Sequence, residues 1–199
     1  MKNYYLKRIT EKLDWEDIPV LEVDEIMWLG DAGIRMKQQL LYDSDAIYVH
    51  QTAFEKNIRE EERDSLSQVC NDSCMEFFFD LGCDNRYFNF EINPLGTIYL
   101  GFGKERKERI RIIDKNPKER FDIRAAHTED GWEVFYKIPL SFIRMFYPDY
   151  QFESGKRFRA NCYKCGDKTT TPHYLAWNRL NCENPDYHRP EDFGLMIFE

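Results

Sequence analysis

The stretch CMEFFFDLGCDNRYFNFEI, residues 74–92, decides the fold class. It contains two aromatic-rich blocks of strand length, and the GCDN segment between them has the glycine and the Asp-Asn pair typical of a tight turn. Because side chains alternate between the two faces of a strand, each block has one apolar row and one mixed row. The stretch therefore predicts an antiparallel β-hairpin with one face on a core.

The mixed rows suggest a second use for the opposite face of this sheet. In the first block Met75, Phe77 and Phe79 share the apolar row, whereas the opposite row holds Cys74, Glu76, Phe78 and Asp80. The second block places Tyr87, Asn89, Glu91 and Asn93 on that opposite side, and the segment RFRANCYKC adds Arg157, Arg159, Asn161 and Tyr163. Carboxylates, amides and guanidinium groups have directional donors and acceptors that suit hydroxyl groups. An ordinary solvated face is the alternative interpretation.

Similar blocks recur along the whole chain. The ten strand candidates are residues 34–42, 46–54, 74–81, 86–92, 97–103, 108–113, 132–139, 156–165, 173–177 and 193–199. Only residues 57–68 and 140–146 have a helical pattern. Aromatic residues make up 16% of the 199 residues, a content that favours an aromatic β-core. We expect a single domain over residues 1–199, all-β, built as a sandwich or barrel with minor helical turns.

Charge and the N-terminal segment exclude several classes of partner. The net charge is −8, and no long Lys/Arg cluster is present, so neither nucleic acid nor an anionic membrane is expected as a partner. The one basic run, residues 103–112, alternates with Glu and is predicted to be a solvated strand or hairpin. Residues 1–15 contain no apolar region of a signal peptide, and a cytoplasmic location follows by default if this is the native start. The sequence leaves the oligomeric state open.

The six cysteines are expected to be free thiols. They lie at positions 70, 74, 83, 162, 165 and 182. The segment Cys162-Tyr-Lys-Cys165 is similar to a zinc knuckle, and Cys70 and Cys74 could complete a four-thiolate site. Strand alternation sends Cys162 and Cys165 to opposite faces, however, so zinc is disfavoured and buried thiols are predicted.

Five segments, in order, carry a family resemblance. They are DSCMEFFF (72–79), YFNFEINPLGT (87–97), GWEVFYKIPLSFI (131–143), NCYKCGDKTTTPHYLAWNRL (161–180) and PDYHRPEDFG (185–194). Over roughly residues 20–199 the chain resembles the family 9 carbohydrate-binding modules, most closely the stand-alone family 9-like branch. The resemblance implies a jelly-roll-like β-sandwich of two antiparallel sheets that binds sugar without catalysis. It implies no cofactor, although relatives carry structural calcium and the turn YDSDA (42–46) could supply oxygen ligands.

The resemblance also implies a set of ligand-binding residues. In the family two tryptophans sandwich a sugar ring, in the best-known members at the reducing end of a glucan or xylan chain, while a glutamate, an arginine and amides hold its hydroxyls. Carried over, these residues are Glu76, Asn89, Glu91, Asn93, Arg159, Asn161 and Trp177. The expected partner is a mono- or oligosaccharide, with no catalytic residue and no metal ligand. Trp28 and Trp132 are expected in the core.

One position departs from the family pattern. Six residues before Glu76, where the first sandwiching tryptophan would lie, this sequence has Cys70. Loss of one stacking face should cost about 1–3 kcal/mol, which lowers affinity about tenfold or more. Two other functions therefore stay open: a glycoside-processing enzyme that uses Glu76 and Glu91, and a scaffold domain that has lost its sugar.

Overall fold

The computed structural model describes residues 1–9, 15–64 and 66–199. In these residues strands predominate, and helices are limited to the single turns α1 (Pro117–Arg120) and α2 (Leu140–Ile143) and to short 3-10 segments at Trp15–Asp17, Val69–Asn71 and Pro190–Asp192. The predicted all-β class is confirmed. Within the described ranges, no helix has the length and apolar character needed to cross a membrane.

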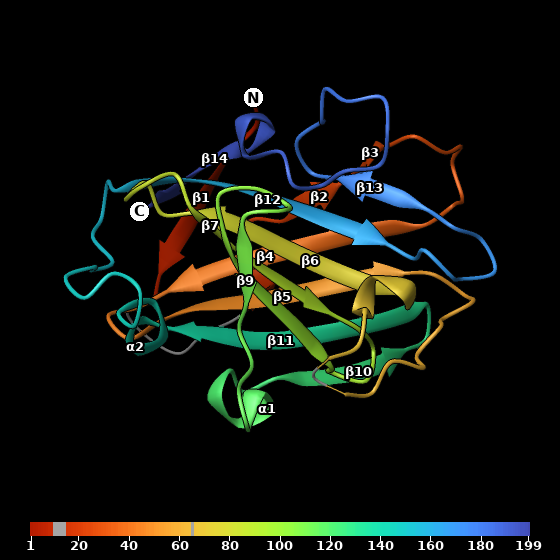
Figure 1. Ribbon diagram of the computed structural model, residues 1–199, viewed down its shortest axis with the longest axis horizontal. Helices are drawn as coiled ribbons and strands as arrows, with labels where there is room; N and C mark the ends of the chain where they lie inside the picture. The colour runs from red at the N-terminus through yellow and green to blue at the C-terminus, as the bar shows by residue number, and fades with distance from the viewer. Residues whose placement is uncertain (10–14, 65) are drawn as a thin grey trace.

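The strands form one curled sheet with two halves (Figure 1). The first half, here called the site half, contains β14 (Gly194–Phe198), β12 (Arg157–Cys165), β6 (Cys74–Asp80), β7 (Tyr87–Ile92), β8 (Ile98–Gly103) and β9 (Arg109–Arg111), with β13 (Tyr174–Ala176) and β3 (Glu25–Ile26) beside β12. The second half contains β2 (Leu21–Val23), β4 (Arg35–Tyr42), β5 (Ala46–Phe54), β11 (Gly131–Pro139) and β10 (Arg124–Thr128). In Figure 1 strands of the two halves overlie one another.

The first strand joins the two halves. Strand β1 (Asn3–Arg8) pairs in parallel with β14 of the site half and with β4 of the second half. The prediction of two separate, purely antiparallel sheets is therefore not confirmed, because these parallel pairs make the sheet continuous. The antiparallel hairpin of β6 and β7 is confirmed, with Glu76 directly opposite Glu91.

All ten predicted strand blocks contain a strand, but one predicted helix is absent. Residues 57–64 and 66–68 run as an irregular loop, and Ser65 lies outside the described residues. Asp72 explains the loop, because its carboxylate accepts hydrogen bonds from the backbone N–H groups of Glu61 and Glu62 and pairs with Arg59. These bonds replace the helical ones. Strands β1, β2, β3 and β10 lie outside the predicted blocks.

The main core lies between the two halves. As the alternation predicts, Met75, Phe77 and Phe79 from β6 and Phe88 and Phe90 from β7 face this core and are buried. Each such side chain contributes about 1.5–3 kcal/mol by leaving water. Aromatic packing therefore holds the site half against the second half.

The opposite face of the site half is buried as well, which alternation alone does not predict. Phe78, Tyr87 and Tyr163 have no exposed surface, since the loops that carry Tyr187 and Phe193 cover them and form a second apolar cluster. Cys162 faces the main core and Cys165 the second cluster, which confirms the predicted opposite orientations. The polar row of the sheet is therefore enclosed, and a cavity lies over part of it.

Candidate functional site

A cavity of about 230 Å³, here called the site cavity, lies over the polar row of the site half. Its floor comes from adjacent strands, with Glu76 on β6, Glu91 on β7, Tyr99 on β8 and Cys165 on β12. Loops supply the walls, with side chains that include Trp28, Cys70, Arg106, Asp167 and His188. Segments far apart in the sequence thus converge on one small volume.

Two buried carboxyl groups dominate the floor. Glu76 and Glu91 are register partners on neighbouring strands and are only 3% and 6% exposed. The Cys165 thiol donates a hydrogen bond to Glu76 Oε1 at 3.0 Å, and Asn89 Nδ2 donates to Glu91 Oε1 at 2.7 Å. Burial, and next the proximity of Glu91, raise the pKa of Glu76 well above its usual range. Burial therefore favours the protonated form of Glu76, which can both donate and accept.

The second carboxyl group, that of Glu91, has a different electrostatic environment. Burial raises the pKa of Glu91 to about 7, while Arg109 acts in the opposite direction. The Oδ1 atom of Asn89 is buried and has no partner within the described part of the protein. The floor thus combines a carboxyl group with a strongly raised pKa, a carboxyl group with a pKa of about 7 and an amide.

Aromatic rings form one wall. The Trp28 ring lies 5.5 Å from the ring of Tyr174 at 75° and 5.4 Å from that of Tyr187 at 40°. Trp28 Nε1 donates to the carbonyl of Cys182 at 3.0 Å, and the Trp28 backbone has φ 54°, a left-handed conformation that is costly for a large side chain. Packing and this hydrogen bond fix the ring at the cavity edge. The prediction that Trp28 is a core residue is wrong, because its side chain is only partly buried and lines the cavity.

The opposite wall is basic. Arg109 donates from Nη1 to His188 Nε2 at 2.8 Å, and its guanidinium carbon lies 5.2 Å from the ring centre of Tyr99. Arg109 Nη1 also lies 3.1 Å from His188 Nδ1, and the same Nδ1 lies 2.8 Å from the Tyr87 hydroxyl, so the imidazole ring links Arg109 to Tyr87. Burial and then Arg109 lower the pKa of His188 to about 2, so the ring is neutral. The cavity therefore offers directional donors and acceptors opposite aromatic surface.

Comparison with known proteins identifies the family of this chain. A family model described as carbohydrate-binding family 9 matches residues 7–198. The chain belongs to carbohydrate-binding family 9. No match was found among curated proteins.

Solved structures share the fold of this family 9 chain. A Bacteroides uniformis protein, whose carbohydrate-binding role is itself proposed, has a TM-score of 0.85 at 24% identity over 100% of this chain and 99% of its own. A family 9 module from Caldicellulosiruptor kristjanssonii, solved with glucose, has a TM-score of 0.68 at 13% identity over 100% of this chain and 96% of its own. The cellotriose complex gives 0.68 at 12%, over 100% and 94%. At these identities the similarity shows the fold.

Three of the seven predicted site residues meet at the site cavity or its floor. Glu76 and Glu91 line it, and Asn89 lies beneath, bonded to Glu91. Cys70 also lies at the cavity wall, at the position where the family pattern places a tryptophan. The structure thus brings Glu76, Glu91 and Cys70 together around one cavity.

The other four predicted residues fix the surrounding structure. Asn93 binds the carbonyl of Glu62 and the carboxylate of Asp72, and Asn161 bonds the backbone of Asn178 at both its amide atoms. Arg159 donates to the carbonyls of Glu191 and Phe193. These three side chains hold loops in place and do not line the site cavity.

Trp177 does not fit the predicted stacking role. Its side chain belongs to the main core and is 4% exposed. A Cβ atom added to Gly194 would lie 2.4 Å from the Trp177 ring, which shows how closely the strand packs on it. The ring offers no face to a ligand, and the aromatic residues that do line the cavity are Trp28, Tyr99, Tyr174 and Tyr187. Trp132, by contrast, is fully buried as predicted.

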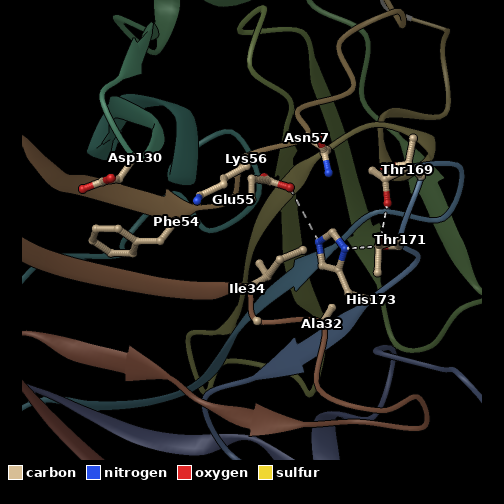
Figure 2. Close-up of a pocket in the computed structure, with 12 residues that line it drawn as sticks. Ala32, Ile34, Phe54, Glu55, Lys56, Asn57, Asp130, Thr169, Thr171 and His173 are labelled. Atoms are coloured by element: carbon tan, nitrogen blue, oxygen red, sulfur yellow. Dashed lines mark hydrogen bonds and ion pairs between the residues drawn. The ribbon is translucent and has the colours of Figure 1, made fainter.

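A second pocket, of about 410 Å³, lies over a buried charge network at the end of the core (Figure 2). Lys164 Nζ, which has no exposed surface, contacts Glu55 Oε1 at 2.9 Å and donates to His173 Nε2 at 2.8 Å and to the carbonyl of Cys165 at 3.0 Å. Glu55 also accepts from Trp132 Nε1 at 2.7 Å and from the Ser73 hydroxyl at 3.0 Å.

This network is complete without a ligand. All three Lys164 protons have acceptors, and Figure 2 shows His173 directed at Glu55 on one side and at Thr171 on the other. Burial and then Lys164 lower the pKa of His173 to about 4, so this ring accepts as a neutral group. We assign the network a structural role, tying β5 and β11 of the second half to β12 of the site half.

Proposed function

We propose that the chain binds one sugar ring, free or at the end of an oligosaccharide, in the site cavity. The supporting observation is the convergence of Glu76 and Glu91 with the ring of Trp28 around one enclosed space. Sugars combine hydroxyl groups with apolar C–H faces. Binding sites of this kind pair a few fixed polar groups with aromatic surface.

The cavity volume limits the size of the ligand. At about 230 Å³ it is smaller than the roughly 300–1,000 Å³ of pockets that enclose drug-sized ligands. One ring fits this volume better than several consecutive rings of a chain. A cavity closed by the floor strands favours recognition of a chain end, and the reducing end is the end that the family resemblance implies.

Four cavity side chains have a proposed binding role. Trp28 stacks on the C–H face of the ring in place of Trp177, and the side at Cys70 stays without an aromatic platform. Glu76 binds one hydroxyl group, while Glu91 and Arg109 bind further hydroxyls. The relative solved with glucose supports a sugar of this size.

Calorimetric screening of mono- and oligosaccharides tests the proposal. We expect one-site binding that weakens when the reducing end is reduced to an alditol. Glu91→Gln should weaken binding, and the matched variant Glu129→Gln, at an exposed position, should not. The absence of binding to any sugar at millimolar concentration would contradict the proposal and leave a scaffold domain.

A glycosidase is the second candidate function. Glycosidases use two carboxyl groups that flank the bond to be cleaved, and Glu76 and Glu91 are two carboxyl groups on paired strands. A family of binding modules gives it no support. Turnover of a chromogenic glycoside that disappears in Glu76→Gln would favour the enzyme. We expect no turnover.

A further inference from the structure

We propose that Cys74, Cys165 and Glu76 form a binding site for a thiophilic divalent cation, such as Zn²⁺ or Cd²⁺, at the inner end of the site cavity. The proposal goes beyond sugar binding. It also differs from the zinc knuckle considered from the sequence, because Cys162 faces the main core and takes no part.

Strand pairing brings the three donors together. Cys74 on β6 lies directly opposite Cys165 on β12, and Glu76 follows two residues later on the same face of β6. The two sulfurs and a Glu76 oxygen all lie within 4.8 Å of one another. Tetrahedral zinc, with bonds of about 2.3 Å to sulfur and 2.0 Å to oxygen, places its ligands about 3.5–3.8 Å apart. Small side-chain rotations therefore suffice. Within the described residues this is the only such group of His, Cys, Asp or Glu side chains.

The surroundings favour a cation. Cys74, Cys165 and Glu76 are 0%, 1% and 3% exposed, and Glu91 and Asp167 lie nearby at the cavity wall. Burial, and after it the carboxyl groups of Glu76 and Glu91, raise the pKa of Cys74 to about 12, and the pKa of Cys165 is also raised, so without metal the thiols keep their protons. A dication that displaces both thiol protons and the Glu76 proton leaves a complex of charge −1 and releases three protons.

The cavity gives the ion a path and a free coordination position. Cys165 and Glu76 line the cavity, whereas Cys74 lies behind them. The fourth position of a tetrahedral ion therefore faces the cavity, where water, a sugar hydroxyl or the Cys70 thiol can occupy it.

Titration of the metal-free full-length chain with Cd²⁺, in excess Mg²⁺, tests the proposal. We expect one equivalent to bind, with the ultraviolet absorption of cadmium–thiolate bonds. Cys74→Ser and Cys165→Ser should each lose stoichiometric binding, and Glu76→Gln should keep the band but bind at least about tenfold more weakly. Cys83→Ser, at an exposed thiol, is the matched control and should behave as the unmodified chain.

Three outcomes would overturn the proposal: no saturable band, a band that persists in the Cys74→Ser/Cys165→Ser double variant, or a band lost in Cys83→Ser. If the serine variants fail to fold, cadmium NMR of the unmodified chain decides, because ligation by oxygen alone would contradict two sulfur ligands. Sugar titrations of metal-free protein are independent of this result, so failure of one proposal does not remove the other.

Discussion

Replacement of Lys164 by methionine should destabilise the protein strongly. Lys164 is on the core-facing row of β12, and its ammonium group is fully buried against Glu55, which is itself 1% exposed at the side chain. Methionine has a similar length but no charge, so the variant leaves the Glu55 carboxylate buried without its cation. Burial alone would raise the pKa of Glu55, yet Lys164 outweighs it and the pKa is lowered, so the unmodified protein holds an ion pair.

The expected loss is about 3–5 kcal/mol, the usual result of removing one partner from a buried pair. For a chain of this length, at about 2–4 °C per kcal/mol, the melting temperature should fall by about 6–20 °C. Adding Glu55→Gln should recover much of the loss, since the amide oxygen can still accept from Trp132 and no unpaired charge remains.

Urea unfolding of the single variants and the double variant measures these terms as a cycle. Lys104→Met, at an exposed lysine, is the control and should change stability by less than about 0.5 kcal/mol. A loss below about 1 kcal/mol for Lys164→Met, or additive effects of the two substitutions, would refute the reasoning.

Two further predictions concern the site half. Because burial lowers the pKa of His188 from its ordinary 6.5 to about 2, only the unfolded chain gains this proton between those values, and stability is lost as the pH falls below 6.5. At pH 5 the unmodified protein has lost about 2 kcal/mol of its free energy of unfolding through this group. The destabilisation caused by His188→Gln, measured by urea unfolding, should therefore be about 2 kcal/mol smaller at pH 5 than at pH 7. A destabilisation that is equal at the two pH values would contradict this. Gly194→Ala should lower the free energy of unfolding by about 1–3 kcal/mol, because the added Cβ would lie 2.4 Å from the Trp177 ring. Gly30→Ala is the control, since its Cβ would meet nothing within 4 Å. Equal melting temperatures of the two variants would contradict the clash.

Alternation predicted much of the fold because it depends only on local geometry. The period of two assigned Met75, Phe77 and Phe79 to the core, and the short turn at 82–85 fixed the register that places Glu76 opposite Glu91. The same period separated Cys162 from Cys165. Strand β1 was missed, since its pairing with β14 and β4 joins the two ends of the chain and has no local signal.

The rest of the site could not be predicted, because alternation shows which face a side chain is on but not what covers that face. Trp28 and Tyr187 reach the cavity from irregular loops, whose sequences have no period to interpret. Arg109 belongs to a run of alternating charges that is typical of a solvated strand, yet it packs on Tyr99 and His188. Trp177 was misassigned because a residue just past the end of a strand can turn either to the core or to a loop.

Calorimetric titration of Trp28→Ala with the best-binding sugar tests the central claim most directly. If the Trp28 ring stacks on the sugar, the variant should bind about 5- to 150-fold more weakly, the equivalent of about 1–3 kcal/mol. Trp15→Ala, whose ring packs on His50 and Phe135 of the second half, should bind as the unmodified chain does. An unchanged affinity in Trp28→Ala would contradict the assignment of this cavity as the sugar site.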